Sequence, residues 1–175
     1  ALCEETILVS IMYVNNEVGA VQPIEAIAKV IKEQNPKTIY HVDAIQAFGK
    51  YRIYPKRIGV DLLSISGHKI HGPKGTGVLY VNEKVKIKPI VFGGEQQKNV
   101  RSGTENVPGI VGMGKAIELA YKNFDDDNKK MIELRDYFIN EVISKIPNVK
   151  LNGSIKSRLP GNVNFSFEGI EGEEL

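Results

Sequence analysis

An apolar strand pattern runs directly into a lysine in the stretch Val60-Asp61-Leu62-Leu63-Ser64-Ile65-Ser66-Gly67-His68-Lys69. Upstream, two more strand patterns end in polar groups: residues 6–13 lead to Asn15-Asn16-Glu17, and residues 37–43 end on Asp43. Between these two strands, Pro23 opens a segment with helical apolar spacing that Asn35-Pro36 closes. A strand, a helix and a strand in this order predict a right-handed βαβ unit within a parallel sheet.

The remaining segments extend this sheet and then leave it. Residues 77–81 form another strand pattern close behind residues 60–66, so part of the sheet is expected to be antiparallel. Pro108 opens a helix, a second helix follows Asp125-Asp126-Asp127, and residues 149–151 and 162–167 form further strand patterns. The predicted fold is α/β. Residues 1–125 form part of a large domain with a mixed, mostly parallel sheet and flanking helices, and residues 126–175 form a long connecting helix and the start of a small α+β domain.

Composition restricts the class of protein more than its function. With 175 residues, 42% hydrophobic and 25% charged, the chain has ordinary globular values and enough length for one sizeable core. A net charge of +2 predicts no nucleic-acid partner, and no apolar run is long enough to span a bilayer. The single cysteine excludes an internal disulfide and suits a reducing cytoplasm.

The two ends predict an excised central piece of a longer protein. The chain starts without Met and enters a strand pattern within a few residues, and it stops at Glu171-Gly172-Glu173-Glu174-Leu175, which has the pattern of a helix beginning. No basic and apolar leader is present at the start, so no signal peptide is expected.

Lys69 and Asp43 are the candidates for chemistry, since open α/β sheets bind ligands at the carboxyl ends of their strands. A lysine amine for an aldehyde and a carboxylate for a ring nitrogen are what pyridoxal 5'-phosphate (PLP) requires. The local strings leave alternatives open: Lys69 as a solvated loop lysine, and Asp43 as a helix N-cap. Gln46 is either the capping-box partner of Asp43 or a contact to the phenolic oxygen of the cofactor.

The other polar motifs are weaker. Ser66 and His68 suit a phosphate ligand or ordinary turn chemistry. His68 and His71 lack a third ligand with suitable spacing, so no metal site is predicted. The glycine-rich segment 72–77 does not have the P-loop order, which disfavours a nucleotide-binding domain. Cys3 is treated as a bystander, because the neighbouring glutamates would disfavour its thiolate.

Four strings in one order resemble the cysteine desulfurases of the NifS/IscS type, which are PLP enzymes of the class V aminotransferase group with fold type I. The strings are Val14-Asn15-Asn16-Glu17-Val18-Gly19, His41-Val42-Asp43-Ala44-Ile45-Gln46, Ser66-Gly67-His68-Lys69-Ile70-His71-Gly72-Pro73-Lys74-Gly75 and Arg101-Ser102-Gly103-Thr104-Glu105-Asn106. The resemblance covers nearly the whole chain.

The resemblance implies a role for each matching residue. Lys69 resembles the Schiff-base lysine that also moves the substrate Cα proton. Asp43 matches the partner of the pyridine nitrogen, and Gln46 matches the contact to the phenolic oxygen. Asn16 matches the asparagine near the cofactor ring and the substrate carboxylate. The phosphate ligands of the family match Ser66, His68 and Thr104, and Thr104 matches a ligand supplied by the opposite subunit of a homodimer.

The implied reaction converts L-cysteine to L-alanine and passes sulfur, as an enzyme persulfide, to an acceptor such as an iron–sulfur scaffold. The family's persulfide-forming cysteine and its substrate-binding arginine have no match here, and neither do its first phosphate loop and its stacking histidine. We therefore expect the chain to be inactive alone, with activity in its parent. The alternatives are another class V PLP enzyme, such as a selenocysteine lyase or an aminotransferase, and a non-catalytic dimerisation or scaffold module.

Overall fold

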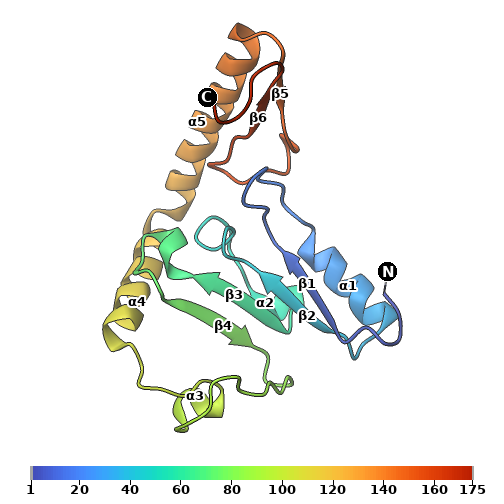
Figure 1. The fold of residues 1–175 in the computed structure, drawn as a ribbon, viewed down its shortest axis with the longest axis vertical. Helices are drawn as coiled ribbons and strands as arrows, with labels where there is room; N and C mark the ends of the chain where they lie inside the picture. The colour runs from blue at the N-terminus through green and yellow to red at the C-terminus, as the bar shows by residue number, and fades with distance from the viewer. Residues whose placement is uncertain (1, 175) are drawn as a thin grey trace.

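The computed structural model describes residues 2–174, which form a mixed sheet followed by two helices and a small hairpin (Figure 1). The elements in chain order are β1 (Leu8–Met12), α1 (Ile24–Gln34), β2 (Ile39–Asp43), α2 (Pro55–Ile58), β3 (Leu62–Ser66), the 3-10 helix η1 (Gly67–Ile70), β4 (Gly77–Val81), α3 (Gln96–Asn99), α4 (Val107–Lys122), α5 (Phe124–Lys145), β5 (Val149–Leu151) and β6 (Phe165–Phe167).

The sheet has the strand order β1-β2-β3-β4. β1 pairs with β2 and β2 pairs with β3 in parallel, whereas β4 returns antiparallel to β3. In register, Met12 lies opposite Asp43 and Asp43 lies opposite Ser64. The polar groups that follow β1, β2 and β3 are therefore delivered to one edge of the sheet.

One face of the sheet carries the core. Tyr40 and Val42 on β2 and Leu63 and Ile65 on β3 are buried, and they alternate with partly exposed residues, as the period of a strand requires. The helix α1 covers this face because its apolar residues recur on one side. The buried residues of the cluster are Val14, Ile24, Ala28, Ile31, Tyr40, Val42, Ala44, Ala47, Ile58, Val60, Leu63, Ile65 and Met113.

The long helix α5 leads away from the sheet to the hairpin of β5 and β6 (Figure 1). Near its start, the rings of Phe124 and Tyr121 stack with centroids 5.2 Å apart. Near its end, Phe138 meets Phe165 of β6 edge-on at 6.0 Å. Its first turn holds Asp125, Asp126 and Asp127, where the helix dipole favours negative charge.

The predicted fold class is confirmed, including the antiparallel strand β4 and the helix-terminal aspartates. The predicted strands 6–13 and 37–43 are each shorter in the structure, and the predicted strand 162–167 is reduced to β6. The short helix α2 and the helical turn η1 were not predicted, because four-residue helices leave no periodic apolar pattern. The domain division at residue 125 stays a prediction.

Candidate active site

Three candidate groups follow the three parallel strands. The turn that carries Asn16 comes after β1, Asp43 is the last residue of β2, and η1 with His68 and Lys69 begins directly after Ser66 of β3. Since these strands are neighbours and parallel, their carboxyl ends lie at one edge of the sheet. The structure thus brings to this edge the candidate residues that were predicted from the sequence, apart from Thr104.

The lysine turn, residues 66–77, is a tight connection between β3 and β4. The Gly67 N–H donates to the Thr76 carbonyl at 2.9 Å, and the Gly72 N–H donates to the Gly67 carbonyl at 2.8 Å. His71 closes η1 in the left-handed region, with φ of +63°. A side chain on Gly67 would place its Cβ 2.5 Å from Thr76 Oγ1, so only glycine fits there.

The helix α4 holds the lysine turn from outside. A Cβ on Gly109 would lie 2.6 Å from Thr76 Cγ2, and one on Gly112 would lie 2.7 Å from Pro73 Cγ. These glycines let the helix backbone approach the turn, and Asn106 Oδ1 caps the helix by accepting from the Gly109 N–H at 3.1 Å. The backbone below Lys69 is therefore fixed by packing, even though the side chain itself is not.

Lys69 and His68 are both exposed side chains on this turn. Within residues 2–174, Lys69 makes no hydrogen bond or ion pair, so its amine is available to a ligand. His68 Nδ1 shares a hydrogen bond of 2.7 Å with Ser66 Oγ, which fixes the imidazole beside the hydroxyl. In either neutral tautomer the pair keeps one hydrogen free, on the imidazole Nε2 or on the hydroxyl, and this donor is available to an anion.

Asp43 is half-buried, and its Oδ1 accepts from the Ile45 N–H at 3.0 Å. Residues 45–47 form a turn and no helix follows β2 directly, so the alternative of Asp43 as a helix N-cap is wrong and the carboxylate caps a turn instead. Oδ2 has no hydrogen-bond partner among the residues that the structure describes. Gln46 is half-buried three residues on and makes no capping-box bond to Asp43 within the same range.

The asparagine turn, residues 15–19, follows β1. Asn15 Oδ1 accepts from the Glu17 N–H at 3.0 Å and from the Val18 N–H at 2.9 Å, which forms an Asx turn. Gly19 closes the turn with φ of +67°. Asn16 lies at the tip with an exposed side chain, so the turn holds its backbone and leaves its amide available to a ligand.

Sequence reasoning gave His41 no role of its own. It lies two residues before Asp43 and therefore on the same face of β2. Its Nδ1 is 2.7 Å from Ser10 Oγ on β1, and its Nε2 is 2.8 Å from Ser64 Oγ on β3. The imidazole thus bridges the three parallel strands behind the site. The sequence did contain a signal for a role of His41, since it is a polar residue in an apolar strand, two positions before Asp43.

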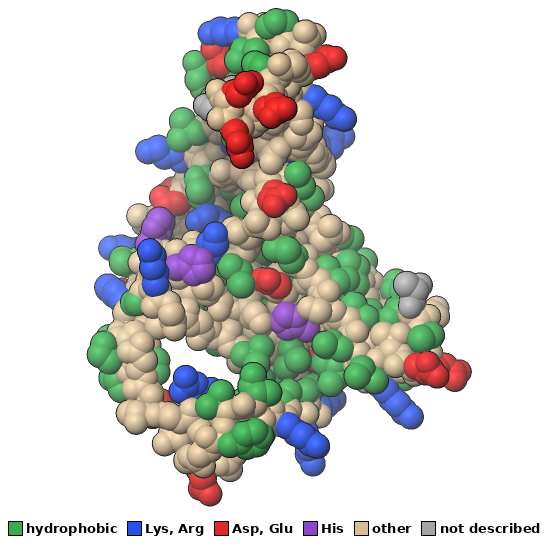
Figure 2. All heavy atoms as spheres, viewed as in Figure 1, with side chains coloured by type: hydrophobic (Ala, Val, Ile, Leu, Met, Phe, Trp, Pro, Cys, Tyr) green, Lys and Arg blue, Asp and Glu red, His purple; other side chains and the backbone are tan. Residues whose placement is uncertain are grey.

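Thr104 is the exception among the candidates. It is exposed, in the connection between α3 and α4, and Figure 1 shows α3 lying apart from the carboxyl ends of the strands. The space-filling view shows an open gap between the segment around α3 and the rest of the molecule (Figure 2). Among residues 2–174, no hydrogen bond or ion pair links Thr104 to the other candidate residues.

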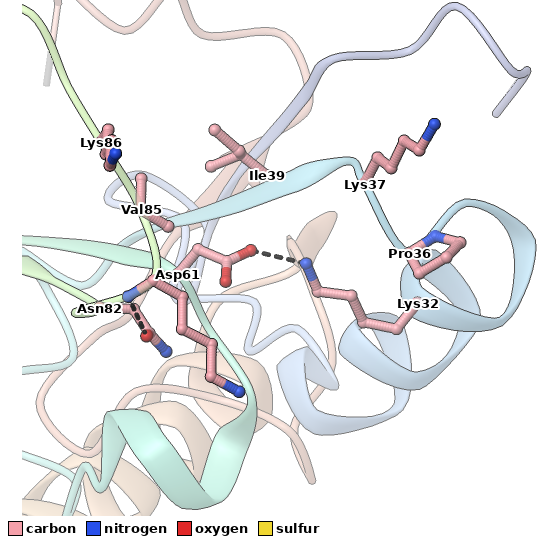
Figure 3. Close-up of a pocket in the computed structure, with 9 residues that line it drawn as sticks. Lys32, Pro36, Lys37, Ile39, Asp61, Asn82, Val85 and Lys86 are labelled. Carbon is pink, nitrogen blue, oxygen red and sulfur yellow. Dashed lines mark hydrogen bonds and ion pairs between the residues drawn. The ribbon is translucent and has the colours of Figure 1, made fainter.

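A hollow of about 480 Å³ lies elsewhere, at the ends of β2 and β3 opposite to the candidate site (Figure 3). Lys32 and Asp61 form an ion pair of 2.7 Å in its wall, and Asp61 also accepts from the Tyr40 N–H at 2.9 Å. This ion pair ties α1 to the start of β3, so Lys32 and Asp61 have a structural role in the fold. The full lining is Lys32, Pro36, Lys37, Ile39, Asp61, Asn82, Lys84, Val85 and Lys86.

Cys3 differs from expectation in one respect. The hydroxyl of Thr6, with further help from the backbone at Glu5, lowers the pKa of the exposed Cys3 thiol. The prediction that the neighbouring glutamates would raise the pKa of the Cys3 thiol is therefore wrong. Among residues 2–174, no three His, Cys, Asp or Glu side chains are grouped to hold a metal ion, and no helix there is long and apolar enough to cross a membrane.

The donor set suits a ligand with three different functions. The Lys69 amine can bond a carbonyl carbon, the Asp43 carboxylate can accept from a protonated ring nitrogen, and Ser66 with His68 can donate to a phosphate. Each of these groups is at the same edge of the sheet, and within residues 2–174 the only hydrogen bond between them is that of Ser66 with His68.

Comparison with known proteins gives a consistent result. The profile of the aminotransferase class-V family matches residues 1–175. The chain is 51% identical, over all of its 175 residues and 44% of the other protein, to the cysteine desulfurase IscS of Dictyoglomus turgidum. The chain therefore spans less than half the length of this curated relative.

Solved structures show the same likeness. A NifS-like protein superimposes with a TM-score of 0.94 at 40% identity, covering 99% of this chain and 47% of that one. The protein SspA, solved in complex with cysteine, superimposes with a TM-score of 0.77 at 34% identity, covering 96% of this chain and 46% of that one.

Proposed function

The chain belongs to the aminotransferase class-V family, and on that premise we propose that it forms part of a PLP-dependent cysteine desulfurase. The observation that carries the proposal is the placement of Lys69 and Asp43 after neighbouring parallel strands, in a chain half identical to a cysteine desulfurase. SspA, a structural relative, was solved with cysteine, which supports the same substrate.

The residues of the chain fit the cofactor. Lys69 Nζ would hold the aldehyde carbon, Asp43 would keep the ring nitrogen protonated, and Gln46 would contact the phenolic oxygen. Ser66 and His68 would hold the phosphate, and Asn16 would lie near the ring and the substrate carboxylate. PLP, when bound, supplies an electron sink that weakens the bonds at the Cα atom of an amino acid.

In the proposed reaction, L-cysteine and an enzyme thiol give L-alanine and an enzyme persulfide, so the sulfur atom moves without an external oxidant. Lys69 Nζ takes the Cα proton of the substrate, since its amine is exposed and unpaired at the edge of the site. Asp43 would accept a hydrogen bond from the protonated ring nitrogen. The turn that carries Lys69 packs against α4, which fixes the backbone at the base of this side chain.

The decisive experiment compares Lys69→Ala with Lys74→Ala in the full-length protein. Both lysines are exposed on the same turn, so Lys74 is a matched control. Alanine formation from L-cysteine should fall at least about a hundredfold in Lys69→Ala and stay unchanged in Lys74→Ala. In the wild type, borohydride should fix PLP on the peptide that contains Lys69.

The products separate the alternatives. Release of a keto acid in place of alanine would identify an aminotransferase, and turnover of selenocysteine but not cysteine would identify a selenocysteine lyase. A wild-type protein that binds no PLP would overturn the enzymatic proposal and favour the scaffold.

We further propose that the enzyme is a homodimer in which Thr104 serves the site of the partner subunit. Within residues 2–174, Thr104 makes no hydrogen bond to the other candidate residues, and a segment ahead of it in the chain exposes three successive apolar side chains, with Ile90 92%, Val91 44% and Phe92 80% exposed. An apolar run of this kind suits a protein interface. Partner subunits would therefore complete each other's sites.

Mixed dimers test this arrangement. A subunit with Lys69→Ala paired with a subunit with Thr104→Ala retains one intact site only if Thr104 acts across the interface. Recovery of activity on mixing the two inactive variants is expected. No recovery in dimers shown to be mixed would place Thr104 in its own site, or outside any site.

The proposed setting is the cytoplasm, and the proposed acceptor is an iron–sulfur scaffold protein. Radiolabelled sulfur from L-cysteine should appear first on the enzyme and then on such a scaffold. Sulfur that leaves only as free sulfide would contradict the carrier role.

A further inference from the structure

The asparagine turn is held by a segment more than a hundred residues away in the chain, the loop of residues 152–164 between β5 and β6. Figure 1 shows this loop adjoining the turn after β1. The Leu159 N–H donates to the Gly19 carbonyl at 2.9 Å, and the Val21 N–H donates to the Ser157 carbonyl at 3.1 Å. The two segments therefore form one hydrogen-bonded unit.

Two side-chain amides of this loop converge on a single carbonyl of the turn. Asn162 Nδ2 donates to the Glu17 carbonyl at 3.0 Å, and Asn164 Nδ2 donates to it at 3.3 Å. Glu17 directly follows Asn16, and its own N–H is held by Asn15 Oδ1. Asn16 is thus placed between groups that are fixed on both sides.

A buried arginine orients Asn162. Arg158 is 4% exposed, and its Nη1 donates to Asn162 Oδ1 at 2.8 Å. Its Nε donates to the Ser154 carbonyl at 3.0 Å, and its Nη2 donates to the Asn152 carbonyl. Within residues 2–174 it forms no ion pair, so the guanidinium serves as a rigid fork for neutral acceptors. Because Arg158 occupies Oδ1, the amide nitrogen of Asn162 must face Glu17.

We propose that Asn162, oriented by Arg158, is a positioning residue that sets the location of Asn16 at the active site through the Glu17 carbonyl. The proposal rests on the proposed function, in which Asn16 lies near the substrate carboxylate. The consequence is that the loop between β5 and β6 controls how well L-cysteine is bound, although none of its residues need touch the substrate.

The substitution Asn162→Asp isolates this contact in the full-length protein. The aspartate keeps an acceptor for Arg158, but it has no N–H for the Glu17 carbonyl and repels that oxygen. Asn128→Ala is the matched control, because Asn128 Nδ2 also donates to a backbone carbonyl, that of Lys50, at 3.2 Å, in a different part of the molecule. Both variants lose one amide hydrogen bond, and only one of these bonds reaches the asparagine turn.

The first readout needs no turnover. Hydrogen exchange at the Val18 and Gly19 amides, which are bonded within the turn, should accelerate about five- to tenfold in Asn162→Asp and remain unchanged in Asn128→Ala. Equal exchange in both variants would show that the hydrogen bond from Asn162 to the Glu17 carbonyl does not stabilise the asparagine turn, and would overturn the proposal. This measurement holds even if the protein does not turn over L-cysteine, so a failure of the proposed function would be recognised separately.

The second readout is kinetic. In Asn162→Asp, KM for L-cysteine should rise about three- to tenfold while kcat changes less than KM, and Asn128→Ala should leave both unchanged. Faster exchange with an unchanged KM would mean that the hydrogen bond from Asn162 to the Glu17 carbonyl only stabilises the turn, and would overturn the positioning role. If Asn162→Asp fails to fold, Asn164→Ala removes the longer of the two hydrogen bonds to the Glu17 carbonyl. A smaller change of exchange and KM in the same direction is then expected.

Discussion

Replacing Gly19 by alanine tests the contact between the asparagine turn and the β5–β6 loop most severely. Gly19 has φ of +67°, in the left-handed region that side chains rarely adopt. A Cβ at this position would lie 2.4 Å from Oδ1, 2.6 Å from Cγ and 2.9 Å from Cβ of Asn162. Because all three atoms are too close, rotation of the Asn162 amide alone cannot relieve the contact.

Two separate costs add in this variant. The left-handed backbone costs a residue with a side chain about 1–2 kcal/mol, and forcing an extra carbon into a packed site costs about 1–3 kcal/mol. The free energy of unfolding should therefore fall by roughly 2–5 kcal/mol. The displaced Asn162 also loses its bond to the Glu17 carbonyl, so KM for L-cysteine should rise as in Asn162→Asp.

The assay is urea unfolding of the full-length protein, followed by circular dichroism. Gly169→Ala is the control, because Gly169 has φ of +84° and nothing within 4 Å of the added carbon. The control should lose only the backbone cost of about 1–2 kcal/mol. The difference between the two variants then measures the steric contact with Asn162.

Equal destabilisation in Gly19→Ala and Gly169→Ala would refute the reasoning, because it would mean that the β5–β6 loop does not rest on the turn. A second signature guards against coincidence: hydrogen exchange at residues 17–19 should accelerate in Gly19→Ala and not in Gly169→Ala.

Two further predictions concern the sheet. Asp61→Asn should lower the free energy of unfolding by about 1–3 kcal/mol, because Asp61 accepts from both Lys32 and the Tyr40 N–H; Asp125→Asn, which breaks an exposed pair, should cost about 0–1 kcal/mol in the same urea assay. Burial raises the pKa of Tyr40 to about 12. The fold therefore disfavours the ionised ring, and roughly 2–3 kcal/mol of stability that is present below pH 10 should be lost as pH rises toward about 12. Tyr40→Phe should remove this part of the alkaline loss in unfolding curves measured across that range, and an unchanged alkaline loss would contradict the assignment.

The strands and main helices could be predicted because their signals are local. A near-continuous apolar run predicts a buried parallel strand, and Ile24, Ala28 and Ile31 recur at helical spacing on the buried side of α1. The carboxyl-end rule then predicts that Asn16, Asp43 and Lys69 share one edge of the sheet. These steps need only the order of the elements along the chain.

The contacts that support the site could not be predicted in the same way. Arg158 and Asn162 lie more than a hundred residues from Glu17, and nothing in their neighbourhood in the sequence marks them as partners of an asparagine turn. Thr104 shows the opposite problem, since its string matches a phosphate ligand of the family while it lies outside the three turns that follow the parallel strands. Its role across a subunit interface stays a prediction.

The glycines connect these two kinds of information. Gly67, Gly109 and Gly112 each lie where a Cβ would meet a side-chain atom of Thr76 or Pro73 at 2.5–2.7 Å, so each marks a place where a side chain of the turn packs directly on a glycine backbone. Gly109 and Gly112 are three positions apart on α4, so they lie on the same face of the helix, the face that holds the lysine turn. The backbone of the lysine turn is therefore held in place because glycines let α4 pack closely on it. The side chains of Lys69, Asn16 and His68 remain exposed at the surface of the site. A ligand that bonds all three groups would meet backbone positions that are already fixed, which reduces the entropy lost on binding.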